Sequence, residues 1–99
     1  TLIGNNVEYA GFYNEYGYFL LENKKYDDAI KQFLTLVQLA PAEVNSFDCL
    51  GEGYMKAGQW QQAKIAFEKA LEIDPEFEPS EDNLKKVNKK LRKQARNNG

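Results

Sequence analysis

The chain has 99 residues, of which 42% are apolar and 28% charged, and a formal net charge of −2. This is enough for one domain with a core, which excludes a disordered acidic tail. The absence of histidine excludes histidine acid–base catalysis, nucleophiles that need a histidine base, and histidine metal sites. Cys49 has no disulfide partner, and no apolar stretch reaches the roughly 18 residues that span a bilayer. We therefore expect no cofactor and no membrane span; composition does not indicate a compartment.

The first half of the chain predicts two helices, near residues 7–22 and 27–39. Apolar residues recur there at steps of three and four, which is the helical period. Asp27 and Asp28 fall in the first turn of the second helix, where the helix dipole favours negative charge.

Two further helices are predicted between residues 44 and 74. The first begins with a stripe that contains Val44 and Leu50, and Gly58 ends it. The second opens at Trp60 and closes before Pro75, because proline disfavours a helical conformation in the residue before it.

A fifth helix is predicted over residues 79–96, with Pro79 at its first position. Its apolar face is narrow, as suits a terminal helix that covers the last unit of an array and shows its other side to water. That face consists of Leu84, Val87, Leu91 and Ala95.

The chain repeats itself with a period of 34 residues. Shifting the sequence by 34 superposes residues of the same class, including Tyr13 on Phe47, Gly17 on Gly51, Tyr26 on Trp60, Ala29 on Ala63, Phe33 on Phe67 and Pro41 on Pro75. A fixed period of this length is typical of proteins built from stacked units.

The landmarks within each period resemble those of the tetratricopeptide repeat family. Residues 44–77 carry them throughout, with Phe47, Leu50-Gly51, Tyr54, Ala63, Phe67, Ala70 and Pro75. Residues 10–43 match more loosely. The resemblance implies an all-α fold, a right-handed superhelix of antiparallel helix pairs with five helices in one domain. Residues 10–43 and 44–77 would be the two repeats and 79–96 a capping helix.

Four small residues mark the places where paired helices are expected to cross closely. A larger side chain there would cost about 1–3 kcal/mol by overpacking. They are Gly17, Ala29, Gly51 and Ala63.

The family resemblance also implies a concave face that binds peptides. Positions 2, 5, 9 and 12 of each first helix, counted from Ala10 and Val44, are expected to point into it, with Cys49 on its rim. Because two of them are acidic, the groove favours a neutral or Lys/Arg-bearing segment over a terminal carboxylate. The alternative is a groove too shallow to bind. The groove residues are Asn14, Tyr18, Leu21, Asn45, Asp48, Glu52 and Met55.

Phe12 and Phe19 do not fit the pattern of the second repeat. They occupy the positions of Ser46 and Gly53, which are small because a preceding repeat packs there. Large aromatic side chains on such a face are expected to be covered. Either residues 2–7, with Leu2, Ile3 and Val7, fold back over them, or a parent domain or a second copy covers them.

Charge is unevenly distributed, at −9 over residues 1–82 and +7 over residues 83–99. One interpretation is a patch for nucleic acid or another anionic surface; the other is a solvated cap. No aromatic residue is interleaved for base stacking, which argues against nucleic acid. The basic residues that define the patch are Lys86, Lys89, Lys90 and Lys93.

The leading hypothesis is therefore a non-catalytic module that binds a protein or peptide partner, as part of a larger protein. Asp48 and Glu52 form an i,i+4 carboxylate pair, but the sequence shows no groups to complete an active site, and Cys49 has no base. A third hypothesis follows from a resemblance of residues 45–75 to short repeat tails of bacterial hydrolases. The catalytic domain would then lie outside this chain.

Overall fold

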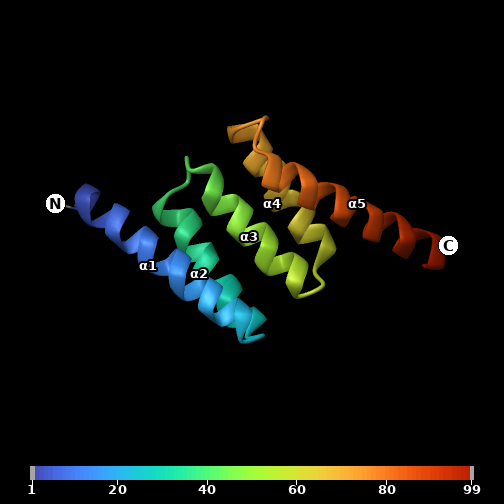
Figure 1. Ribbon diagram of the computed structural model, residues 1–99, viewed down its shortest axis with the longest axis horizontal. Helices are drawn as coiled ribbons and strands as arrows, with labels where there is room; N and C mark the ends of the chain where they lie inside the picture. Colours follow the sequence, from blue (N-terminus) through green and yellow to red (C-terminus); the bar gives the residue numbers. More distant parts are fainter. Residues whose placement is uncertain (1, 99) are drawn as a thin grey trace.

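Five α-helices make up the computed structural model, which describes the backbone of residues 2–98 and the side chains of residues 9–98 (Figure 1). They are α1 (Leu2–Glu22), α2 (Tyr26–Leu39), α3 (Val44–Lys56), α4 (Trp60–Ile73) and α5 (Glu78–Asn98). No strand occurs within residues 2–98. All five predicted helices are present, although α1 begins earlier than predicted and α5 is longer at both ends.

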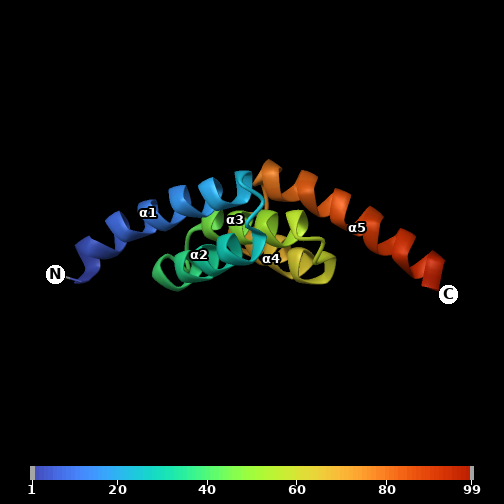
Figure 2. The same cartoon turned by 90° about the horizontal axis from the view of Figure 1, so that it is seen from below.

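The helices form two layers, with α1, α3 and α5 in one and α2 and α4 in the other (Figure 2). Each helix of the second layer packs between two of the first, since α2 contacts α1 and α3, and α4 contacts α3 and α5. The molecule measures 53 × 30 × 17 Å, and the outer ends of α1 and α5 extend away from each other (Figure 1). This leaves one side of the first layer free of the second; we call it the first-helix face.

The turns within the two helix pairs have the same geometry. Lys24 and Gly58, which are 34 residues apart, both adopt a left-handed backbone, with φ of 63° and 77°. In each turn the next amide donates to a carbonyl five residues earlier, Lys25 to Leu20 and Gln59 to Tyr54, both at 2.9 Å. This Schellman arrangement satisfies carbonyls at the helix end. Lysine therefore adopts in the first pair a conformation that glycine adopts more easily in the second.

Each helix pair closes on a phenylalanine ring that lies against a glycine. The Phe33 ring lies where a Cβ atom on Gly17 would be, and a Cβ built on Gly51 would be 2.5 Å from Phe67 Cε1. Ala29 and Ala63 are fully buried beside them. The prediction that these four residues are small because the helices cross closely is confirmed.

The last helix occupies the place of the first helix of a third repeat. α5 begins 34 residues after α3, and its fully buried Val87 packs with Ala63 and Phe67. Leu84 and Leu91 are partly buried against the same cluster, but Ala95 is exposed. The predicted apolar face is thus one residue too long, because α5 runs on past α4 (Figure 1).

Candidate functional site

A line of polar side chains joins α1 to α3. Asn14 Oδ1 accepts hydrogen bonds from the Cys49 thiol at 3.0 Å and from Asn45 Nδ2 at 3.5 Å. The Cys49 sulfur also lies 3.5 Å from the Tyr18 hydroxyl oxygen. We call Asn14, Tyr18, Asn45 and Cys49 the polar ladder. Three of its members are predicted groove residues, and they lie together.

Cys49 is fully buried, so its predicted place on the rim of the groove is wrong. Burial raises the pKa of its thiol to about 11, with smaller contributions from the charges of Glu52 and Asp48, while the hydrogen bond with Tyr18 opposes this. A thiol with this pKa is protonated near neutral pH and is a weak nucleophile. The residue therefore links α1 to α3 rather than offering a reactive group.

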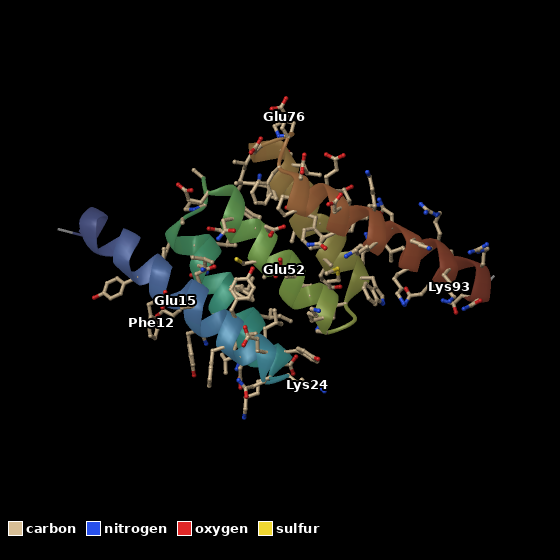
Figure 3. The ribbon with its side chains drawn as sticks, viewed as in Figure 1. Phe12, Glu15, Lys24, Glu52, Glu76 and Lys93 are labelled. Atoms are coloured by element: carbon tan, nitrogen blue, oxygen red, sulfur yellow. The ribbon has the colours of Figure 1, made fainter. Side chains whose placement is uncertain are left out.

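Glu52 lies past Cys49, toward the C-terminal end of α3 (Figure 3). Burial raises the pKa of its carboxyl, as does the neighbouring Asp48 charge, and a hydrogen bond from Tyr18 and the charge of Lys56 oppose this. Burial likewise raises the pKa of the Tyr18 hydroxyl. The Tyr18 ring is held by an edge-on contact with Phe33, at 5.4 Å between centroids. Glu52 is half-buried and reaches the surface, so its charge is available to a ligand.

Asp48 does not line an open groove, contrary to the prediction. Only 4% of its surface is exposed, and its Oδ1 accepts a hydrogen bond of 2.7 Å from the Ser80 hydroxyl at the start of α5. Burial raises the pKa of this carboxyl, and the Ser80 bond opposes the shift. The prediction missed this contact because Ser80 is 32 residues away and only the packing of α5 on α3 brings it there.

A pocket of about 380 Å³ lies between the ends of α1 and α3 nearest the α1–α2 turn. Its walls include the predicted residues Tyr18, Leu21 and Glu52, and Lys56 also lines it. Leu21 is largely buried in the core, so only a small part of its side chain lines the pocket. We call this the α1–α3 pocket; Lys24, also among its lining, is labelled in Figure 3.

A second hollow, of about 610 Å³, lies on the other side of α3, against α5. It is lined by all four predicted patch residues and by Met55. Lys56 and Trp60, which the sequence analysis did not assign to a site, complete the lining. We call it the lysine groove. The patch seemed to lack an aromatic neighbour because Trp60 is far from α5 in sequence. The groove residues are Met55, Lys56, Trp60, Lys86, Lys89, Lys90 and Lys93.

Phe12 and Phe19 are 57% and 59% exposed. Phe12 lies on the side of α1 turned away from α3 (Figure 3), where its ring stacks on Tyr16 at 5.8 Å between centroids. The side chains of Leu2, Ile3 and Val7 lie outside the described residues, but their backbone continues α1, so the expected fold-back is wrong. A contact of this face with a parent domain or a second copy stays a prediction.

Within the described residues, the cysteine, aspartate and glutamate side chains form no cluster that could hold a metal ion. None of the described helices is long and apolar enough to cross a membrane.

Both repeats match models of one family. Residues 10–43 and residues 44–77 each match a model described as tetratricopeptide repeat. The chain belongs to the tetratricopeptide repeat family. The family assignment made from the landmark residues is thereby confirmed, and with it the all-α helical-repeat fold. A domain of this family is generally a protein-interaction module without catalytic activity.

Two curated relatives share part of this repeat domain. It is 35% identical over 72 residues to the tetratricopeptide repeat domain-containing protein PYG7, chloroplastic, of Arabidopsis thaliana, and 32% identical over 60 residues to Superkiller protein 3 of Schizosaccharomyces pombe. These alignments cover 73% and 61% of this chain but only 24% and 4% of the relatives.

Two solved structures share the helix arrangement. The Arabidopsis OM64 TPR domain superposes with a TM-score of 0.83 at 18% identity, covering 89% of this chain and 73% of that domain. The first TPR of Spaghetti (RPAP3), solved with the HSP90 peptide SRMEEVD, has a TM-score of 0.54 at 17% identity, covering 85% of this chain and 94% of its own. At these identities the likeness establishes the fold.

Proposed function

We propose that this repeat domain is a non-catalytic interaction module that binds a peptide segment of a partner protein on the first-helix face, at the α1–α3 pocket. The observation that carries the proposal is the convergence of Tyr18, Leu21 and Glu52 on one pocket beside the polar ladder. The lining combines Leu21 and two tyrosines with charged side chains, and such a mixture of apolar surface and fixed polar groups is usual in a ligand site. The solved RPAP3 domain carries an HSP90 peptide, which supports a peptide as the class of partner.

The proposal that the domain is not an enzyme rests on the state of its reactive groups. The Cys49 thiol is buried, and its raised pKa keeps it protonated. Asp48, one half of the Asp48–Glu52 carboxylate pair, is buried and hydrogen-bonded to Ser80. Neither group can reach a substrate in this fold.

Glu52 favours a partner segment that is neutral or carries a lysine or arginine. Its carboxylate is partly desolvated, so an ion pair there is screened less than one on the open surface. Tyr18 and Asn14 hold polar groups on the same line, where they can bond an extended backbone. Met55 and the exposed Asn45 would extend the contact along α3.

The test is selection of a displayed library of random twelve-residue peptides on the purified domain. We expect the enriched peptides to be neutral or basic and to shift the amide resonances of α1 and α3. Glu52→Gln should weaken a basic peptide about tenfold or more, because hydrogen bonds to a charged group contribute about 1.5–3 kcal/mol.

The matched control is Ile65→Ala, which truncates an exposed residue on α4 in the other layer. Equal binding by Glu52→Gln and wild type, or resonance shifts confined to α4, would refute the site. The hypothesis of a bacterial hydrolase tail stays a prediction, since this chain spans 24% or less of the two curated relatives.

A further inference from the structure

Five lysines surround the lysine groove without an acidic residue among its lining. Two ion pairs of lysine are present within the described side chains, Lys69 with Glu72 and Lys85 with Glu81, and neither lysine lines the groove. Four of the groove lysines share one side of α5, at spacings of three and four residues, where like charges repel one another. The groove is thus a concentration of positive charge that destabilises the helix carrying it.

Favourable interaction with the helix dipole does not account for these lysines. The dipole attracts cations within the last helical turn. α5 ends at Asn98 and has Arg96 in its last turn, whereas Lys86, Lys89 and Lys90 lie two or more turns earlier. Lys56 does lie in the last turn of α3. The lysines on α5 therefore need another explanation.

The groove also has an apolar part. Met55 and Trp60 are partly buried and pack against the cluster of Ala63, Phe67 and Val87. Lys90 Nζ lies 5.6 Å from the centre of the Trp60 ring, a cation–π contact. A ligand in this groove would meet apolar surface and ammonium groups together.

We propose that the lysine groove binds an acidic peptide segment of a partner protein, with at least two aspartate or glutamate residues flanking one large apolar residue. The charge of the groove selects the acidic residues, and Met55 and Trp60 receive the apolar one. Lys86 and Lys93 are seven residues apart on α5, about 10 Å along the helix axis, which matches about three residues of extended chain. The groove adjoins the proposed α1–α3 pocket at Lys56 but does not depend on it.

Nucleic acid and anionic membranes fit the groove less well. Trp60 is the one aromatic residue among the groove lining, so successive bases would not find the series of rings on which single strands stack. Trp60 is half-buried at the start of α4 rather than protruding, as a residue inserting into lipid would. Residues 1–82 carry a charge of −9, which opposes a long polyanion that extends beyond the groove over the rest of the molecule.

The probe is the peptide Gly-Ser-Glu-Leu-Glu-Asp-Gly-Ser with an amidated C-terminus and fluorescein on its N-terminal amine; the unlabelled copy is acetylated there instead. Its binding is followed by anisotropy, and an unlabelled copy by the emission of Trp60, the only tryptophan in the chain. We expect saturable binding with a change in Trp60 emission. Replacing the three acids by their amides, or leucine by serine, should weaken binding at least tenfold and threefold respectively.

The decisive comparison uses two double variants with the same change in net charge. Lys89→Gln with Lys93→Gln removes charges from the groove, and Lys85→Gln with Arg92→Gln removes charges from α5 outside it. We expect the groove variant to bind the peptide at least tenfold more weakly and the control variant less than twofold. Circular dichroism of both verifies that the helices are intact.

Equal losses in the two variants would overturn the proposal, because binding would then follow total charge. It would also be overturned if a labelled twelve-nucleotide single strand of DNA or phosphatidylserine vesicles bound with the same dependence on Lys89 and Lys93 while the peptide did not. The variants leave Tyr18 and Glu52 unchanged, so failure here is distinguishable from failure of the α1–α3 pocket.

Discussion

α1, α3 and α5 occupy equivalent places in the repeat, yet they differ at the two positions that face the preceding helix pair. α3 and α5 have small or medium residues there, Ser46 and Ser80 at the third position and Gly53 and Val87 at the tenth. α1 has Phe12 and Phe19. All four residues on α3 and α5 are buried, whereas both phenylalanines are exposed.

The cause of the difference is visible at Gly53. A Cβ atom there would lie 3.1 Å from the Phe33 ring of α2, so the second helix of a repeat leaves little room at the tenth position of the next first helix. A phenylalanine at that position, as in α1, leaves no room for a helix packed as α2 packs on α3. Any partner of the α1 outer face must therefore pack differently from a preceding repeat.

The largest expected effect concerns positions that the repeats share. Gly51→Ala places a methyl group against the Phe67 ring, and Gly17→Ala does the same at Phe33. Overpacking should lower the free energy of unfolding of each variant by about 1–3 kcal/mol. The better helix propensity of alanine should restore about 0.5–1 kcal/mol of this. Chemical denaturation measures the loss. Gly11→Ala is the control: with nothing within 4 Å of its Cβ, it should stabilise. Equal stability of all three variants would contradict the close crossing.

The next effect concerns the positions where α1 differs. Phe12→Ala with Phe19→Ala should leave the helix content unchanged, because both side chains are already exposed in the single chain. We expect sedimentation velocity at rising concentration to show association of the wild type that the double variant has lost. The control is again Ile65→Ala, an equally exposed apolar residue on α4. A wild type that stays monomeric throughout would rule out a second copy on this face.

The smallest effect concerns the contact between α3 and α5. Burial raises the pKa of Asp48, so the folded state holds its proton more tightly than the unfolded state. Stability should therefore fall as the pH rises from the ordinary aspartate value, about 3.9, through the raised one, and Glu52 adds to this fall.

Asp48→Asn should reduce the dependence of stability on pH. Its free energy of unfolding at pH 7 should stay within about 1 kcal/mol of the wild-type value, because the amide oxygen can still accept the hydrogen bond from Ser80. Ser80→Ala should instead lower the free energy of unfolding by about 1–3 kcal/mol, because it leaves the buried Asp48 carboxylate without its hydrogen-bond donor. The fall of stability with pH should become steeper. Thermal melts from pH 3 to pH 8 measure both. A wild-type profile that rises over this range would contradict the assignment.

Much of the site could not be predicted from the sequence because its contacts join residues far apart in the chain, 32 positions for Ser80 and Asp48 and 30 for Lys90 and Trp60. The 34-residue period places Asn14, Tyr18 and Asn45 on the same side of the first helix of each repeat, and in the structure hydrogen bonds link Asn14 to Asn45 and, through Cys49, to Tyr18. It did not show that Ser80 covers Asp48, or that Trp60 joins the lysines of α5. Both contacts depend on the position of α5 along the axes of α3 and α4.

The amino-acid sequence by itself determined the five helices, their pairing and the small residues at which they cross, because helical period, turn residues and side-chain size act over a few residues and recur in each repeat. Only the tertiary structure decided which charged groups are buried and which gather in one groove. The burial of a charged side chain and its distance from other charges are fixed when helices far apart in sequence come into contact, so a local sequence pattern does not predict them.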